Sequence, residues 1–114
     1  MALIRKAREI ASRRPDGPGW KEARERLLAG PAQGCDRFTV RTLSLGPGGA
    51  TPRTERPGSR MLQVLLGEVL LMDGDGGLTR LSTGDAAVIR PMERHHLLNE
   101  SPGPARVLLV DEPR

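Results

Sequence analysis

The chain has 114 residues and a formal net charge of +4, with 37% hydrophobic and 28% charged residues. This length excludes two full domains, and no apolar run is long enough to span a membrane, so we expect one compact domain without a membrane partner. The single cysteine, Cys35, excludes an internal disulfide, and the polar N-terminus lacks the apolar core of a signal peptide, which together favour a reducing, cytoplasmic location.

Residues 1–19 form a basic N-terminal arm in this interpretation, and residues 20–114 form the main domain. Apolar residues between Leu3 and Ala11 recur at helical spacing, and the Pro- and Gly-rich run that follows ends the pattern. A short amphipathic helix or a loose arm is therefore predicted. Residues 1–30 hold eight of the 18 Lys and Arg, so the basic excess lies at this end, which is either a solvated terminus or a phosphate-binding tail.

The remainder of the chain has the short apolar runs and frequent turn residues that are typical of an all-β protein. Residues 21–30 are the exception, because their composition favours a helix. Arg37 to Leu45 alternates with a period near two and predicts a strand, and Gly46 to Gly49 predicts the turn that ends it. Similar short runs separated by Gly, Pro and Asp predict strands at 61–66, 68–72, 78–81, 86–90, 95–99 and 106–110. This spacing is typical of a β-sandwich or barrel.

The segment from Gly48 to Gly67 resembles the first motif of the cupin family. That motif begins with a glycine, which is followed by five residues and then by His-x-His. After three or four further residues it has a glutamate or third histidine, and six residues later it ends with a glycine. Here Thr54 and Arg56 stand at the two histidine positions, and Arg60 stands at the acidic position. The glycines of the motif are present, whereas the residues that bind metal in the family are replaced.

The second cupin motif resembles Gly84 to Asn99, with His95 and Asn99 at the family's histidine and asparagine positions. Arg90 fills the proline position, and Met92 fills the position of the second glycine. The chain is therefore identified as resembling a small single-domain cupin, the type-2 conserved barrel, with a degenerate metal-binding motif. This resemblance implies an all-β double-stranded β-helix, also called a jelly-roll barrel, with a short N-terminal helix or arm.

The resemblance continues upstream, where small single-domain cupins have a Trp, a strand and a Phe-x-x-Arg segment like Trp20, residues 22–28 and Phe38 to Arg41. We therefore expect Glu22 to Leu28 to form the first strand despite its helical composition, because tertiary pairing overrides weak propensities.

In the family, the motif histidines and the acidic residue converge on a divalent metal inside the barrel. Arginine has no lone pair to offer a cation, so His95 is the single regular ligand left among these positions. We therefore expect no metal cofactor. The alternative is a rearranged site built from His95, His96 and Glu55, which requires a slip or bulge, because strand alternation aims His96 and Glu55 at the opposite face.

The same substitutions turn the predicted cavity positive. The family register points Arg56 and Arg60 into the barrel, with Arg53 at its rim, and guanidinium groups match carboxylates and phosphates with paired hydrogen bonds. A ligand site formed by Arg56, Arg60, His95, Thr54 and Arg53 would bind a small anion. The alternative is that Arg56 and Arg60 turn to solvent or pair with an acidic side chain, for which the sequence offers Glu55, Glu68 and Glu93.

The apolar faces of the predicted strands also indicate whether two copies of the chain associate. With Arg60 inward, Leu62, Val64 and Leu66 would fill the core, and the last strand is apolar on both faces. Small cupins commonly dimerise through such a sheet, so a homodimer is expected; coverage of the sheet by the N-terminal helix is the alternative.

The sequence is compatible with three functions, and no nucleophile motif identifies a catalytic residue. The favoured function is a metal-free cupin that binds a small anionic molecule as a sensor or accessory binding module. The alternatives are a metal-dependent dioxygenase, isomerase or decarboxylase with a rearranged site, and a nucleic-acid partner that binds through the basic arm.

Overall fold

Eight strands account for most of the regular structure in the computed structural model, which describes residues 2–113. Two single turns of 3-10 helix, Ala7–Glu9 and Pro31–Gln33, complete the elements. The strands are β1 (Lys21–Ala29), β2 (Thr39–Ala50), β3 (Arg60–Leu66), β4 (Glu68–Asp73), β5 (Leu78–Ser82), β6 (Ala86–Ile89), β7 (His95–Leu98) and β8 (Ala105–Asp111).

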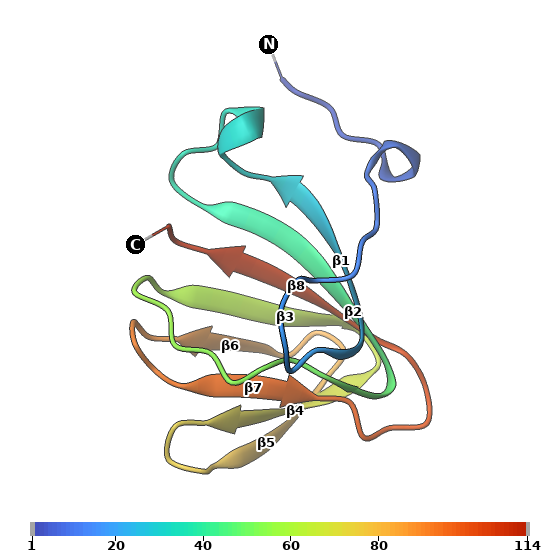
Figure 1. Ribbon diagram of the computed structural model, residues 1–114, viewed down its shortest axis with the longest axis vertical. Helices are drawn as coiled ribbons and strands as arrows, with labels where there is room; N and C mark the ends of the chain where they lie inside the picture. The colour runs from blue at the N-terminus through green and yellow to red at the C-terminus, as the bar shows by residue number, and fades with distance from the viewer. Residues whose placement is uncertain (1, 114) are drawn as a thin grey trace.

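The strands pair antiparallel in the order β5-β4-β7-β2-β8-β3-β6, and β1 adds to β2. The sheet curls into a nearly closed barrel, with β2, β8 and β3 side by side and β7, β4 and β5 completing the roll (Figure 1). Inward side chains of alternate positions fill it, including Leu43, Leu45, Leu62, Val64 and Val107, each at most 1% exposed. The predicted all-β jelly roll is confirmed.

Strand β1 confirms the prediction for residues 22–28, against their helical composition. Seven residues of β1 pair with β2, and the inward side chains Ala23 and Glu25 are buried against the barrel. As a solvated helix this segment would bury little, whereas as a strand it covers the edge of β2. Pairing and burial therefore outweigh a helix preference of a few tenths of a kcal/mol per residue.

The predicted turn at residues 46–49 is wrong, because β2 continues to Ala50. Gly48 takes a left-handed φ of 79° and redirects the strand without ending it. Its N–H donates to the carbonyl of Asn99, and Ala50 pairs with Leu98, so the end of β2 leaves β8 and joins β7. This bend lets one strand contribute to both sides of the barrel.

The predicted core position of Leu66 is also wrong. The pairing of β3 with β8 shifts register between Val64 and Leu66, which is the mark of a bulge. Beyond the bulge Leu66 is 48% exposed, while Leu62 and Val64 are fully buried as expected.

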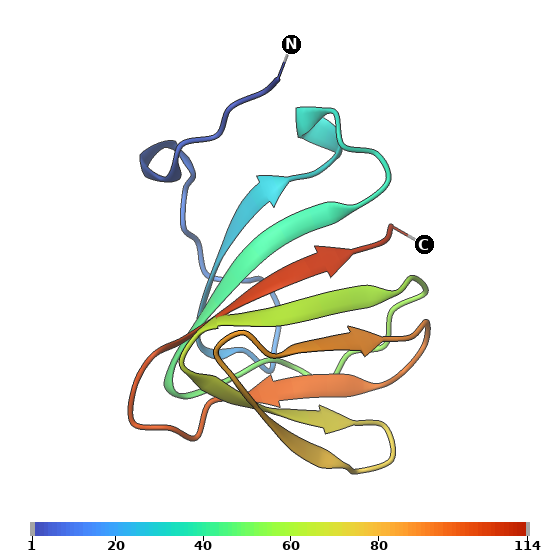
Figure 2. The same ribbon diagram turned by 180° about the vertical axis from the view of Figure 1, so that it is seen from behind.

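The N-terminal arm is loose apart from its single 3-10 turn, which decides between the two predicted alternatives. Figure 2 shows it running beside β1 at the edge of the sheet. Its backbone forms a bridge between Arg13 and Glu25, and the Arg13 guanidinium lies 2.7 Å from the Glu25 carboxylate. Ile10 is buried, whereas Leu3 and Ile4 are exposed. A helix this short gains too little from packing to form.

Asn99 is fully buried and links β2, near its bend, to the loop that precedes β8. Its Nδ2 donates to the carbonyls of Leu45, Gly46 and Gly103 at 2.9–3.1 Å. Its Oδ1 accepts from the N–H and the hydroxyl of Ser101. Every polar atom of the amide thus has a partner, which explains an asparagine in an apolar interior.

Met92, at the position of the second glycine of the motif, has a left-handed φ of 62° and a side chain that is 57% exposed. We expect Met92→Gly to raise the free energy of unfolding by about 0.5 kcal/mol, because relief of the left-handed strain exceeds the added entropy of the unfolded chain. Urea denaturation measures the change. Met92→Ala keeps the Cβ and should give no gain; a Met92→Gly protein less stable than Met92→Ala would contradict the explanation.

The outer face of the sheet carries an apolar row across five strands, formed by the paired residues Ala29, Val40, Val110, Met61 and Val88. Val88 is 70% exposed, and the arm does not bury its own Leu3 and Ile4 against any part of the sheet. The homodimer stays a prediction. Within residues 2–113, no helix has the length and apolar character to cross a membrane.

Candidate functional site

A chamber of about 270 Å³ lies inside the barrel, near the ends of β3, β7 and β8. Its lining combines apolar side chains with polar and charged ones. Three arginines and one histidine are among the polar residues. The full lining consists of Trp20, Glu25, Arg41, Leu43, Thr51, Thr54, Arg56, Arg60, Leu62, His95, Leu97 and Leu109.

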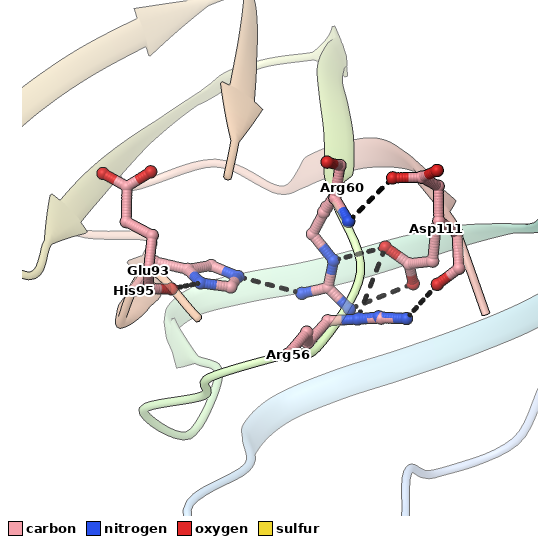
Figure 3. Close-up of polar contacts among 7 residues, drawn as sticks. Arg56, Arg60, Glu93, His95 and Asp111 are labelled. Atoms are coloured by element: carbon pink, nitrogen blue, oxygen red, sulfur yellow. Dashed lines mark hydrogen bonds and ion pairs between the residues drawn. The ribbon is translucent and has the colours of Figure 1, made fainter. Parts of the chain in front are cut away.

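Arg60 is held by Asp111, which lies directly opposite it in the β3–β8 ladder. The guanidinium forms a two-pronged bond, with Nε donating to Oδ1 at 2.6 Å and Nη2 donating to Oδ2 at 3.1 Å. Both side chains are largely buried, and Figure 3 shows the carboxylate facing the flat edge of the guanidinium. This geometry is the strongest arrangement for the pair and fixes the orientation of Arg60.

His95 holds the third nitrogen of Arg60. Nε2 of His95 lies 3.1 Å from Nη1 of Arg60, and Nδ1 lies 3.1 Å from the carbonyl of Glu93. A guanidinium only donates and a carbonyl only accepts, so the ring is neutral, with the proton on Nδ1 and the lone pair of Nε2 facing Arg60. Burial lowers the pKa of His95, the Glu93 carbonyl opposes that shift, and the positive charge of Arg60 reinforces it.

Arg56 approaches the same carboxylate from the 51–59 loop and is incompletely paired. Its Nη2 donates to the carbonyl of Glu112 at 2.8 Å, and its Nε lies 3.9 Å from Oδ1 of Asp111. Its Nη1 is buried and has no hydrogen-bond partner. Burial lowers the pKa of Arg56, Asp111 raises it, and Arg60 and Arg41 lower it further. The group still carries its charge at any ordinary pH.

Arg41 lies on β2 and adds a third guanidinium to the lining of the chamber. It shares the inward face of that strand with Leu43 and Leu45, and no ion pair joins it to a carboxylate of residues 2–113. Glu25, the acidic residue of the lining, is paired with Arg13 of the arm, and Asp111 lies behind Arg56 and Arg60. Asp111 is therefore left to balance three guanidiniums, and the chamber carries a positive excess.

The structure brings together four of the five predicted ligand residues. Thr54, Arg56, Arg60 and His95 all line the chamber, and Thr54 forms a backbone bridge with His95. Arg53 does not line it: this side chain is exposed and borders a separate surface depression.

The predicted acidic partners of Arg56 and Arg60 are replaced by a different one. Glu55 pairs with Arg94 at 2.8 Å, and Glu68 lies 3.8 Å from Arg80. Asp111 was missed, although the alternation of inward Val107 and Leu109 extends to it. The same alternation through Leu45 and Leu43 extends to Arg41. Both residues could therefore have been found by continuing the two-residue period to the strand ends.

The residues at the family's metal positions do not fit a divalent cation. Two of them are guanidiniums, and the Nε2 lone pair of His95 already accepts from Arg60. His96 and Glu55, the predicted substitutes, do not line the chamber. Within residues 2–113, no three His, Cys, Asp or Glu side chains gather closely enough to hold a metal ion.

The lowered pKa of His95 predicts a loss of stability in mild acid. The unfolded chain binds the proton at the ordinary pKa of about 6.5 and the folded protein binds it only at lower pH, so stability is complete above that value and falls as the pH drops below it. The slope is at most about 1.4 kcal/mol per pH unit for one histidine.

Urea denaturation at pH values of about 7.5, 6.5 and 5.5 tests this prediction. His95→Gln should flatten the pH dependence, because the amide donates and accepts without titrating. His96 is the matched control: its pKa is also lowered, by burial and then by Arg53, but it is less buried, so His96→Gln should remove a smaller part of the slope. An unchanged slope in His95→Gln would contradict the assignment.

Known proteins share both the sequence pattern and the fold of this chain. The Cupin domain family model matches residues 41–111. The polyketide cyclase RemF from Streptomyces resistomycificus is 25% identical with a TM-score of 0.91, covering 100% of this chain and 81% of that one. A sugar phosphate isomerase from a cupin superfamily, from Silicibacter pomeroyi, is 22% identical with a TM-score of 0.84, covering 96% and 75%.

A predicted oxalate decarboxylase from Thermotoga maritima is 19% identical with a TM-score of 0.86, covering 96% of this chain and 98% of that one. Among curated protein sequences, none matches the chain. The family match spans well over half of the sequence, includes both motif regions, and agrees with the eight-stranded barrel. The chain therefore belongs to the cupin domain family.

Proposed function

We propose that this cupin binds a small organic anion in its barrel chamber, without a divalent metal, and serves as a sensor or accessory binding module. The observation that carries the proposal is Nη1 of Arg56, a buried guanidinium nitrogen without a partner in a chamber that has more guanidiniums than carboxylates.

A bound anion would relieve two unfavourable features of the chamber, an unpaired buried donor and the repulsion between positive charges. A buried donor without a partner costs about 1–3 kcal/mol, and more when the group is charged. Positive charges crowded into one cavity also repel each other. A carboxylate between Arg41 and Arg56 would accept from the free nitrogen and balance part of the charge, because planar guanidiniums match carboxylates with parallel bonds.

The barrel fold alone does not determine the function, because proteins of similar structure include a cyclase and an isomerase. The choice rests on the side chains. With arginines in place of imidazoles and carboxylates, the wall of this chamber presents donors to a ligand where a metal site would present lone pairs. This supports anion binding over a reaction that depends on a divalent cation.

A thermal-shift experiment tests the proposal with acetate, benzoate, phosphate and sulfate against chloride at equal ionic strength. At about ten times its Kd, a ligand adds about 1.4 kcal/mol, which raises the Tm of a domain of this size by about 6 °C. We expect this rise with at least one of the anions, and we expect Arg56→Met to abolish it.

Arg53→Met is the matched control, because Arg53 lies outside the chamber and its loss should leave the shift intact. A shift that survives Arg56→Met, or no shift with any anion, would count against the proposal. Elemental analysis of protein purified without chelators should show far less than one divalent metal per chain. A stoichiometric metal that His95→Ala removes would overturn the metal-free part.

A further inference from the structure

We infer that the ligand of the chamber is a monocarboxylate with an apolar body, as opposed to a polyhydroxylated acid, a dicarboxylate or phosphate. This inference rests on the proposed function, since it takes the anion site as given.

Only one place in the chamber is free to bind a charged group. Each nitrogen of Arg60 already has a partner, in Asp111 or His95 (Figure 3). Nη1 of Arg56 and the guanidinium of Arg41 remain, and both side chains line the chamber. A single carboxylate would use these donors, and a second anionic group would find no further free guanidinium to pair with.

The uncharged walls offer almost nothing to a hydroxyl. Four leucines, Leu43, Leu62, Leu97 and Leu109, belong to the lining. The lining has two side-chain hydroxyls, and each already forms one backbone bond: Thr51 Oγ1 accepts from the N–H of Leu97 at 2.9 Å, and Thr54 Oγ1 donates to the carbonyl of Pro52 at 3.1 Å. A sugar acid would therefore bury more hydroxyls than these two groups can pair, and that loss is larger than the gain from its apolar carbons.

Trp20 supplies a further apolar wall. Its indole N–H donates to the carbonyl of Asp16 at 3.0 Å, so the polar atom of the side chain is engaged outside the chamber and the ring itself lines it. The chamber volume of about 270 Å³ equals roughly nine water molecules at about 30 Å³ each, which is room for a small aryl or alkyl acid. Because Trp20 is the one tryptophan of the chain, its fluorescence reports occupancy directly.

The experiment compares four probes of related size on the full chain: 3-phenylpropanoate, gluconate, succinate and the neutral alcohol 3-phenylpropanol. Trp20 fluorescence and isothermal calorimetry give each Kd at constant ionic strength. We expect 3-phenylpropanoate to bind at least about tenfold more tightly than the other three, because each of them leaves buried polar groups unpaired or lacks the charge. Arg41→Met and Arg56→Met should each weaken it by about tenfold or more, while Arg53→Met should not.

The outcomes separate the inference from the proposed function. Equal or tighter binding of gluconate or succinate, still lost in Arg41→Met, would overturn the apolar-body inference and leave anion binding standing. Equal binding of the alcohol and the acid, or binding indifferent to both arginine variants, would overturn both. Failure of all four probes would also overturn both. Arg41 has no ion-pair partner among residues 2–113, so Arg41→Met should fold even where Arg56→Met does not, and the unfolding transition of each variant checks this.

Discussion

Replacing Asp111 by Asn should lower the free energy of unfolding by about 3 kcal/mol or more. The carboxylate is 4% exposed and holds Arg60 through two hydrogen bonds, with Arg56 nearby. The amide keeps the shape but removes the one negative charge left to balance three guanidiniums. The variant therefore has buried cations without compensation, which costs far more than the hydrogen bond itself. Urea denaturation near neutral pH measures the loss.

Glu68→Gln is the matched control, because Glu68 belongs to an exposed pair with Arg80 and its replacement should cost less than about 1 kcal/mol. Formate offers a second test in Asp111→Ala, where a free carboxylate can enter the space of the deleted one. We expect formate to raise the Tm of this variant more than that of the unmodified protein. A loss below about 1 kcal/mol in Asp111→Asn would show that the pair does not hold the wall together.

Replacing Asn99 by Asp should lower the free energy of unfolding by about 3–5 kcal/mol, which urea denaturation measures. The Nδ2 group donates to three carbonyl oxygens, and a carboxylate oxygen in its place would face all three as a fourth acceptor. Burial of Asn99 at 0% exposure prevents water from separating them. Strand β2 and the loop that precedes β8 would then lose the side chain that links them.

Gln63→Glu provides the matched comparison for Asn99→Asp. It makes the same chemical change at a side chain that forms one solvent-exposed bond, to the carbonyl of Gly84 at 3.2 Å. We expect a cost of about 1 kcal/mol or less there. Similar costs at the two positions would show that Asn99 acts through something other than its three carbonyl contacts.

The sequence predicts most of the strands because their signals are local. Alternation and turn residues mark β3 to β8 to within one residue at most ends. For β1 the local signal is a helix, and the prediction of a strand depends on the resemblance to small cupins. The gain that decides the matter, burial of Ala23 and Glu25 along β2, is a tertiary contact that no window of ten residues contains.

The errors have the same origin. A bulge after Val64 shifts the alternation by one residue and turns Leu66 outward, and the pattern of apolar residues does not mark where the bulge falls. The bend at Gly48 depends on a change of partner strand from β8 to β7. In both places the backbone responds to its neighbours across the sheet.

The candidate site could be predicted in part. The motif register placed Arg56, Arg60 and His95 in the same cavity, and the structure places all three in the lining. The charge partner of Arg60, Asp111, lies 51 residues further along the chain, and the pairing of β3 with β8 brings the two side by side. Charge balance in a barrel depends on such cross-strand neighbours. Composition and spacing therefore identify the cationic residues but not the residue that neutralises them.

Arg60 is held from two sides by residues of the protein itself, Asp111 and His95. An occupant would thus meet a surface whose shape is already set, and little torsional freedom would be lost when it enters. Under those conditions encounter rates vary little among analogues, and differences in affinity arise as differences in residence time. Stopped-flow traces for a series of acids should accordingly diverge in their dissociation phases while their association phases nearly superimpose.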